Sequence, residues 1–331
     1  MGNRREVLTF GEVLLRYSTD PGERVRDAHR FHVHVAGSEL NVAASLAHLG
    51  QRVRMVTALP ASPLGALARR KIASYGVVLA GDMAAPGRMG TYYYEPGVPP
   101  RPAVVTYDRD GSAFSRYPWT RFDWSKAVAP AGVLFTTGIT AALSPEAAGG
   151  IRAAMEAAHQ AGILIAFDVN YRSKLWPASE ARRVLLPLLE RVQYLFTSWD
   201  DAVDVLGAPG DSPETLLEWL ARQFSLRCAT MVYNPPDADP AVRWRAAAWC
   251  EGRYVFHDET APVQTVDRVG AGDAYAAGFL WALLETGDVR EGVRLGSAMM
   301  ALKCTYRGDV CLADPDDVRR LANGITGGVS R

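Results

Sequence analysis

The segment from residue 267 to 279 reads DRVGAGDAYAAGF and places an acid, Asp273, directly after Gly270, Ala271 and Gly272. An apolar stretch typical of a helix follows it. Small residues let a phosphate approach the backbone, and the free N–H groups and dipole of a first helical turn favour its negative charge. An aspartate in that turn would lie beside a transferring phosphoryl group and could accept a proton from an attacking hydroxyl. The segment therefore predicts a phosphoryl-transfer site with Asp273 as its base.

The same turn has plainer interpretations. Gly-Ala-Gly also permits tight packing of a helix against a strand, and an aspartate by itself favours a helix N-terminus. The turn is not a Walker A loop, because no Gly-Lys-Ser/Thr follows, and no GxGxxG stands after the first expected strand. A dinucleotide-dependent oxidoreductase, the general expectation for an alternating α/β chain, is therefore disfavoured.

A second segment supports phosphoryl transfer. Residues 35–50 read VAGSELNVAASLAHLG. With residues 267–279, this segment resembles the two signatures of the ribokinase-like (PfkB) carbohydrate kinases, a Gly-Gly segment followed by NxAxxLAxLG, and DxxGAGDxFxxGF. Ala36 replaces the first glycine, and Tyr275 replaces the usual Phe. Because the two signatures stand near opposite ends of the chain and in the expected order, the resemblance covers nearly all of it.

The resemblance implies a fold and several residue roles. The fold is α/β, a ribokinase-like three-layer α/β/α sandwich with a mostly parallel central sheet and a small β-sheet lid, in one kinase domain over residues 1–331. Asp273 is then the catalytic base, and the N–H groups of Gly270 to Asp273 form an anion hole. Gly37 and Asn41 line the sugar site, with a turn and a helix cap as their structural alternatives.

The middle of the chain indicates the acceptor. Residues 137–148 and 167–182 resemble the 2-keto-3-deoxygluconate kinases, in which an SGIT…LSPEA segment precedes DxNxRxxLW. Arg172 follows an expected strand end, so its guanidinium can reach a cleft and bind a carboxylate through two parallel hydrogen bonds. A surface position, or simple pairing with Asp168, is the alternative.

The resemblance adds three contacts from the lid to a sugar acid. They are Arg109, Tyr92 and Tyr107. The tyrosines have the alternative of filling a core or a dimer interface. A neutral-sugar or nucleoside kinase of the same fold would not need Arg109 and Arg172 together, so the charge of the substrate separates these functions.

The nucleotide side departs from the family pattern. The resemblance implies ATP and Mg²⁺ as cofactors, admits a monovalent cation, and puts Asp267, Ser198, Gly270 and Gly272 beside the nucleotide. The family carries K-x-G-x-x-G near the ATP phosphates, whereas residues 231–244 read MVYNPPDADPAVRW, without lysine or glycine. Either the loop binds ATP in another way, or the chain is a degenerate, non-catalytic sugar-acid-binding protein.

A metal-supporting motif is altered as well. The family's Asn-x-x-Glu supports the hydration shell of magnesium, and the aligned residues here are Ser198 and Asp201, with Asp200 as an alternative to the latter. The Gly-x-Asp-x-x-Gly turn of relatives is reduced to ASPLG, which keeps only Gly65. Because the GAGD turn and Asp273 survive, we favour an active enzyme.

The composition excludes other partners. Of 331 residues, 48% are hydrophobic and 22% charged, and 36 Lys+Arg balance 36 Asp+Glu, so nothing favours a nucleic-acid or membrane-surface binder. The N-terminus lacks a signal-peptide core, and the four cysteines have no metal-binding spacing. We expect a cytoplasmic protein whose partners are a small-molecule sugar acid and a nucleotide. The resemblance implies a homodimer through the lid.

The elements that must position these residues follow a regular alternation. Short β-branched runs alternate with alanine-rich stretches, which predicts a mostly parallel sheet covered on both faces. The expected strands are 53–59, 133–138, 163–169, 194–197 and 229–233. The expected helices are 64–75, 145–161, 178–190, 213–224, 271–285 and 290–305. Residues 12–36 and 88–116 predict an antiparallel lid sheet over a ligand crevice, and residues 233–245 a loop or hairpin connection.

Overall fold

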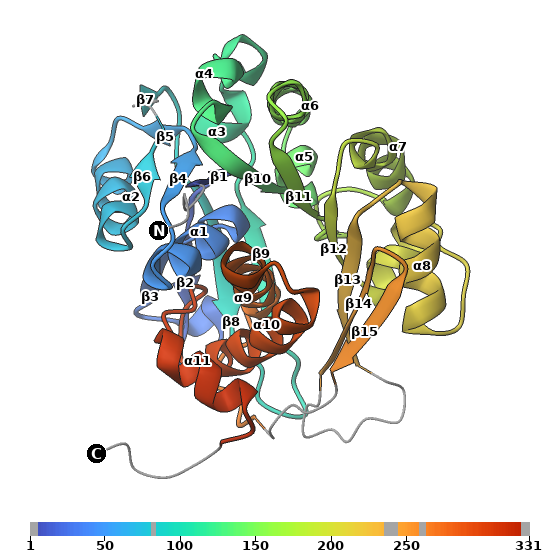
Figure 1. Ribbon diagram of the computed structural model, residues 1–331. Coiled ribbons are helices and arrows are strands. Elements are labelled where there is room, and N and C mark those ends of the chain that lie inside the picture. Colours follow the sequence, from blue (N-terminus) through green and yellow to red (C-terminus); the bar gives the residue numbers. More distant parts are fainter. Residues whose placement is uncertain (1–5, 81–83, 235–243, 258–262, 326–331) are drawn as a thin grey trace.

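A computed structural model describes residues 6–80, 84–234, 244–257 and 263–325 of the chain. A large sheet runs through its centre in the order β15-β14-β13-β12-β11-β10-β1-β4-β6 (Figure 1). Its strands are β1 Glu6–Phe10, β4 Val53–Val56, β6 Val78–Leu79, β10 Ala131–Thr137, β11 Leu164–Asp168, β12 Tyr194–Ser198, β13 Cys228–Tyr233, β14 Arg245–Cys250 and β15 Arg253–His257.

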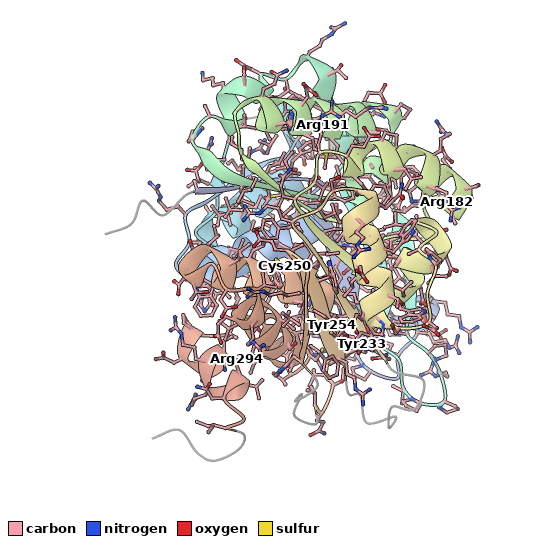
Figure 2. The ribbon with its side chains drawn as sticks, turned by 45° about the vertical axis from the view of Figure 1, so that its right-hand side comes forward. Arg182, Arg191, Tyr233, Cys250, Tyr254 and Arg294 are labelled. Carbon is pink, nitrogen blue, oxygen red and sulfur yellow. The ribbon has the colours of Figure 1, made fainter. Side chains whose placement is uncertain are left out.

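Within this sheet, neighbouring strands are parallel from β6 at one edge as far as β13, and β14 and β15 add an antiparallel edge. The five strands expected from the sequence are confirmed, and so is the mostly parallel sheet. Residues 235–243 of the expected loop lie outside the described residues, and β14 pairs antiparallel with β13 after it. Figure 2 shows this edge, where Tyr233 and Tyr254 lie close together.

Helices cover both faces of the sheet, because successive strand residues point to opposite faces and both sets are apolar. In β10, Leu134 packs in one core and Phe135 in the other. One face carries α1 Ser38–His48, α2 Pro63–Ser74, α9 Ala271–Thr286, α10 Val289–Lys303 and α11 Pro315–Ala322. The other carries α3 Ala113–Arg116, α4 Trp124–Val128, α5 Gly138–Ala142, α6 Pro145–Gln160, α7 Ala178–Leu189 and α8 Pro213–Gln223. The three-layer α/β/α sandwich and the six expected helices are confirmed.

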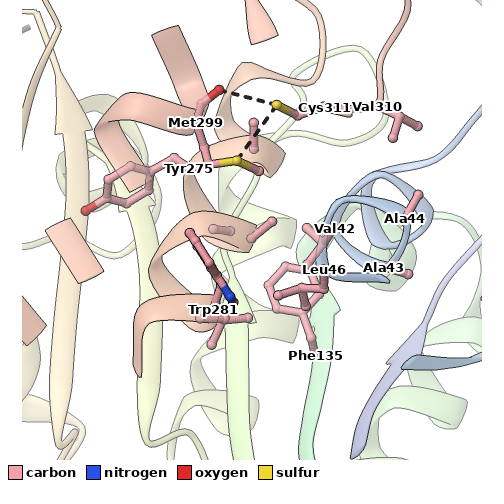
Figure 3. Packing of buried hydrophobic residues seen from close by; sticks show 14 of the residues in the cluster. Val42, Ala43, Ala44, Leu46, Phe135, Tyr275, Trp281, Met299, Val310 and Cys311 are labelled. Atoms are coloured by element: carbon pink, nitrogen blue, oxygen red, sulfur yellow. Dashed lines mark hydrogen bonds between the residues drawn. The ribbon is translucent and has the colours of Figure 1, made fainter. Parts of the chain in front are cut away.

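The core between α1, α9 and the sheet fixes the start of α9, where the candidate site lies. Val42 and Leu46 of α1 pack near Trp281 of α9 and Phe135 of β10 (Figure 3). All four side chains are at most 1% exposed. Burial of a large apolar side chain contributes about 1.5–3 kcal/mol, so this contact holds the two helices firmly relative to each other.

A second, smaller sheet has the order β3-β2-β8-β9. Its strands are β2 Leu14–Ser18, β3 His32–Ala36, β8 Gly90–Glu95 and β9 Val104–Asp108, within the two expected segments. The expectation of a purely antiparallel sheet is wrong, because β2 and β8 pair in parallel, although β2–β3 and β8–β9 are antiparallel. The parallel pair forms since β2 and β8 are joined through the main sheet, and only neighbours in sequence can pair through a short turn.

Short elements complete the described chain. They are β5 Leu59–Pro60 paired with β7 Ala84–Ala85, the 3₁₀ helices Val25–Asp27 and Trp119–Arg121, and a π-helical turn at Asp201–Val205. Within the described ranges, every helix is too short or too polar to serve as a membrane span.

Candidate active site

Two cavities meet at the start of α9. The first, of about 430 Å³, lies between the small sheet and α1, and we call it the small-sheet cavity. The second, of about 420 Å³, lies beyond the carboxyl ends of β11–β13, and we call it the main-sheet cavity. Both are lined by Asp168, Asn170, Arg172 and Gly272. Ligands of open α/β sheets bind at such strand ends, so groups held in the two cavities would meet beside Gly272.

The carboxylate of Asp273 lies at this junction and is held by two residues of α1. Ser38 Oγ donates to Asp273 Oδ1 at 2.5 Å, and Asn41 Nδ2 donates to Asp273 Oδ2 at 2.7 Å. Asn170 Nδ2 donates to Ser38 Oγ at 2.9 Å, which fixes the hydroxyl in turn. Asp273 is 8% exposed and lines the small-sheet cavity. The side chain is therefore oriented before any ligand binds.

Burial raises the pKa of Asp273 above its ordinary value, although hydrogen bonds from Asn41 and Ser38 and the charge of Arg172 act in the opposite direction. A carboxylate with a raised pKa is a stronger proton acceptor than an exposed aspartate. Burial and the neighbouring Asp273 and Asp201 also raise the pKa of Asp168 well above its usual range. The junction thus gathers carboxylates, with Arg172 as a nearby cation.

The two glycines of the turn serve different purposes. Gly270 caps α9 in the left-handed region at φ 84°, and a Cβ there would lie 1.9 Å from the carbonyl oxygen of Asp309. A Cβ at Gly272 would meet no protein atom within 4 Å and would point into open space. Gly270 is therefore required by the backbone, whereas Gly272 keeps the junction of the cavities free.

Fewer N–H groups of the expected anion hole are free than the sequence suggests. The N–H of Ala271 donates to the carbonyl oxygen of Arg268 at 3.2 Å. Within the described part of the chain, the N–H groups of Gly272 and Asp273 have no hydrogen-bond partner. First-turn donors of this kind, at the positive end of the helix dipole, suit a phosphate.

The expected substrate residues come together around one cavity. Those that line the small-sheet cavity are Gly37, Asn41, Tyr92, Tyr107, Arg109 and Arg172. Gly37 has φ 147°, and a Cβ on it would lie 2.2 Å from the Glu12 carbonyl oxygen, so close approach of two chain segments requires this glycine. The hydroxyl of Tyr92 is already engaged, because it donates to the carboxylate of Asp309.

Arg109 is held by an acid that the sequence analysis missed. Its Nε donates to Glu12 Oε2 at 2.8 Å, its Nη2 donates to the same oxygen, and Ser112 Oγ donates to Glu12 Oε1. Glu12 is 2% exposed and Arg109 is 6% exposed. Glu12 therefore neutralises part of the positive charge of Arg109. Arg172 is exposed and remains the less neutralised cation at the junction of the cavities. The position of Glu12 just after the first strand was the available signal.

Of the residues expected beside the nucleotide, some line the main-sheet cavity and one lines neither cavity. Ser198 and Asp201 line the main-sheet cavity at the end of β12. The carboxylate of Asp201 accepts a hydrogen bond from the N–H of Tyr171 at 3.2 Å, and Ser198 Oγ accepts one from the N–H of Asp201 at 3.1 Å. Asp267 lines neither cavity, since its carboxylate accepts hydrogen bonds from Arg16 and from two backbone N–H groups. The structure brings Ser198 and Asp201 to the site, and Asp267 beneath it.

Glu39 is a second missed residue. It lines the small-sheet cavity, is 1% exposed, and its Oε1 accepts hydrogen bonds from the Thr137 N–H at 3.0 Å, Thr137 Oγ1 at 2.8 Å and Thr140 Oγ1 at 2.7 Å. Burial raises the pKa of Glu39 to about 7, against the effect of these hydrogen bonds. The helical position of Glu39, two residues before Asn41, gave no sign of burial because charged residues are rarely buried.

We predict that Glu39→Gln stabilises the protein at alkaline pH. The pKa of Glu39 is about 7 in the folded protein and 4.5 when unperturbed, so the folded state binds more protons between these values and stability falls as pH rises through this window. Above pH 7 the buried charge costs about 3 kcal/mol, and a neutral amide that keeps Oε1 as acceptor removes that cost.

Urea unfolding at pH 5 and pH 8 measures the effect. The advantage of Glu39→Gln over wild type is expected at pH 8 and should vanish at pH 5. The exposed Glu146→Gln is the matched control and should behave as wild type at both values. An equal effect of Glu39→Gln at the two pH values would contradict the raised pKa.

Known proteins resemble this chain over its full length. Residues 4–314 match the family described as pfkB family carbohydrate kinase. The 2-dehydro-3-deoxygalactonokinase of Haloferax volcanii is 34% identical over 98% of this chain and 99% of that protein. The crystal structure of 2-dehydro-3-deoxygluconokinase from Thermotoga maritima has a TM-score of 0.91 and 31% identity, over 97% of this chain and 98% of that one.

A more distant neighbour shares the fold. The structure of a putative ribokinase II from E. coli in complex with ATP and Mg²⁺ has a TM-score of 0.84 at 16% identity, covering 97% of this chain and 99% of that one. At that identity the likeness concerns the fold. The match of the family over nearly all of the chain, together with the oriented Asp273 beside two ligand-sized cavities, leads to one conclusion: the chain belongs to the pfkB family of carbohydrate kinases, which are phosphotransferases with an alcohol group as acceptor.

Proposed function

We propose that this kinase transfers the γ-phosphoryl group of ATP to a hydroxyl of a sugar acid, with 2-keto-3-deoxygluconate (2-dehydro-3-deoxygluconate) as the first candidate. One observation carries the proposal. The buried carboxylate of Asp273, held by Ser38 and Asn41, lies where the small-sheet cavity meets the main-sheet cavity. A base in that position can serve a hydroxyl from one side while a phosphoryl group approaches from the other.

The reaction follows from this geometry. Asp273 accepts the proton of the acceptor hydroxyl while the hydroxyl oxygen forms a bond to the γ-phosphorus and the bond between that phosphorus and the β-phosphate oxygen breaks. ADP is the leaving group, and the product is a phosphate ester. The free N–H groups of Gly272 and Asp273 hold the charge of the transferring group. The small sheet lines the acceptor cavity as a lid and would exclude water, which otherwise competes with the sugar hydroxyl.

An acidic acceptor is supported by the cations of the small-sheet cavity. Arg172 lines it as an exposed cation, and Arg109 keeps a buried position beside it through Glu12. A guanidinium binds a carboxylate through paired hydrogen bonds, which a neutral sugar cannot accept in the same way. The related kinases of Haloferax volcanii and Thermotoga maritima are named for the galactonate and the gluconate, two epimers, so both acids belong in the substrate panel.

ATP as donor is supported by the walls of the main-sheet cavity. Aromatic side chains there offer flat apolar surfaces to a nucleobase, and they are Phe196, Trp199, Tyr233, Trp244 and Tyr275. The expected K-x-G-x-x-G loop has no counterpart in the sequence, so the positive charge near the phosphates must come from elsewhere. Arg172, which lines both cavities, is the candidate.

The carboxylates of the junction fit magnesium carried by the nucleotide. Among the described residues, no cluster of three or more Asp, Glu, His or Cys side chains is arranged to hold a metal alone. Mg²⁺ commonly binds through substrate phosphates, water and one or two carboxylates, and Asp201 with Asp168 would supply these. Burial and repulsion by neighbouring carboxylates raise the pKa of Asp168. A nearby cation would reduce this repulsion. When bound, the ion offsets the negative charge of the phosphates.

The outer face of the small sheet supports a homodimer. Tyr17 of β2 is paired with Val33 of β3 and Tyr93 of β8, on the face opposite Arg16 and Tyr92. The rings of Tyr17 and Tyr93 stack with centroids 5.5 Å apart, and Val33 is 47% exposed. An apolar sheet face of this kind is commonly covered by a partner. We place the protein in the cytoplasm, which is supported by four cysteines free of disulfides.

The first test is turnover of ATP with magnesium over sugar acids, neutral sugars and nucleosides. We predict turnover on sugar acids, and a loss of about 10²-fold to 10⁴-fold in kcat for Asp273→Asn because the general base is removed. Coupled measurement of ADP gives the rate. Asp211→Asn, an exposed acid outside both cavities, is the matched control and should match wild type.

Two outcomes would redirect the proposal. Equal turnover on neutral sugars or nucleosides would move the protein to another substrate class of its family. No turnover on any acceptor, while a sugar acid still raises the melting temperature, would make it a degenerate sugar-acid-binding protein.

The two glycines of the turn provide a second prediction. Gly270→Ala is expected to lower the free energy of unfolding by at least about 1 kcal/mol, because of its positive φ and the clash with Asp309. Gly272→Ala should keep stability and weaken nucleotide binding, since its methyl group would occupy the junction of the cavities. Thermal melting and calorimetric titration with a non-hydrolysable ATP analogue measure the two effects. Unchanged nucleotide affinity in Gly272→Ala would exclude phosphate from this place.

A third prediction concerns the homodimer. Light scattering on a sizing column should give twice the 36.0 kDa mass of one chain for wild type. Tyr93→Asp should give the single-chain mass, because a charge is introduced on the outer face of the small sheet. Phe256→Asp, at an exposed aromatic of β15, is the control and should keep the dimer mass. A wild-type monomer would refute the proposal.

A further inference from the structure

A lysine lies fully buried beneath the glycine turn. Lys303 is the last residue of α10 and is 0% exposed. Its Nζ donates to the carbonyl oxygen of Asp267 at 3.0 Å and lies 3.4 Å from that of Tyr306, whose ring is 5.7 Å away. Lysine is almost never buried without a reason, since its ammonium loses its hydration. Two backbone carbonyl oxygens replace part of that hydration here.

Two carboxylates lie near this ammonium. Burial and the charge of Arg16 lower the pKa of Lys303, while Asp267 and Asp309 act to raise it. Those two carboxylates are shared with a second buried cation, Arg16, whose Nη2 donates to Asp267 Oδ2 at 2.6 Å and whose Nη1 donates to Asp309 Oδ1 at 3.0 Å. Arg16 is 2% exposed. Two fixed cations thus lie among the oxygen atoms of two acids and two carbonyl groups.

These oxygen atoms belong to the segments that shape the phosphate site. Asp267 stands three residues before Gly270, and the carbonyl oxygen of Asp309 lies where a Cβ of Gly270 would be. Cys304 accepts hydrogen bonds from the N–H groups of Val266 at 2.7 Å and Asp267 at 3.2 Å. Residues 304–312 therefore contact the glycine turn and hold its backbone in place. Figure 3 shows their attachment to α10, where Cys311 Sγ contacts Met299.

The family resemblance admits a monovalent cation, and the residues beneath the turn do not fit one. A potassium ion needs several carbonyl or carboxylate oxygens in place of its water. The carbonyl and carboxylate oxygens of Asp267 already accept hydrogen bonds from Lys303, Arg16, Val269 and Gly308, and the carboxylate of Asp309 accepts them from Arg16 and Tyr92. A monovalent cation bound here would have to displace the ammonium of Lys303, which is covalently part of the chain.

We infer that the ammonium of Lys303, together with Arg16, permanently supplies the positive charge that a bound monovalent cation would otherwise bring to the glycine turn, so that this kinase needs no such ion. Lys303 acts as a positioning residue, because its Nζ holds the backbone of the turn and touches no reacting atom. A fixed charge of this kind favours the developing negative charge of the transferring phosphoryl group. Only the kinetic part of this inference rests on the proposed function.

The experiment compares cations in wild type and Lys303→Met. Melting temperature and kcat are measured in tetramethylammonium, sodium, potassium and ammonium chloride at equal ionic strength. The melting temperature and kcat of wild type should be the same in all four salts. Lys303→Met should melt lower in tetramethylammonium and lose about tenfold or more in kcat, with a smaller change in the KM of the sugar. Potassium or ammonium should restore part of both losses in a saturable way. Lys126→Met, at an exposed lysine, should resemble wild type.

Two results would overturn the inference. One is a saturable rise in the melting temperature or rate of wild type with potassium. The other is a Lys303→Met protein that equals Lys126→Met in tetramethylammonium. Should wild type turn over no acceptor, the proposed function fails, and the melting temperatures still decide whether Lys303 replaces a cation.

Discussion

The buried guanidinium of Arg16 is the contact on which the site depends, because it joins three segments that are distant in sequence. Arg16 belongs to β2 of the small sheet, Asp267 precedes the glycine turn, and Asp309 follows α10. All three side chains are at most 4% exposed, so each charge relies on its partners in place of water. Loss of one partner from such a network typically costs about 3–5 kcal/mol. The small sheet and the turn are therefore fixed relative to each other by charge.

The chemistry of the site follows from that constraint. With the turn held in place, α9 begins at Ala271, directly after its cap Gly270, and directs the free N–H groups of its first turn to the place where the two cavities meet. Helix α1, packed on α9 through Val42 and Leu46, brings Ser38 and Asn41 to Asp273. The donors and the proposed base, Asp273, are oriented before ligands arrive, which would lower the reorganisation needed in the reaction.

Much of the fold was predictable because its signals are local. A parallel sheet covered on both faces has apolar strands that alternate with helices, and the alternation of β-branched runs with alanine-rich stretches appears in sequence at β10–β13 and α6–α10. The pairing of β2 with β8 was not predictable, since strands that are distant in sequence carry no turn that would reveal their direction. Glu12 and Glu39 were missed because their hydrogen-bond partners are distant in sequence. Glu12 accepts hydrogen bonds from Arg109 and Ser112, and Glu39 accepts them from Thr137 and Thr140.

The sequence by itself determined the family and the glycine turn and predicted Asp273 as the base, because backbone conformation and helix start are set by a few adjacent residues. Only the tertiary structure decided how those residues work. It paired Asp267 with Arg16 and Arg109 with Glu12, and it buried Lys303 next to the glycine turn. Charges act across space with a strength that depends on burial, and burial is a property of the whole fold that no single segment contains.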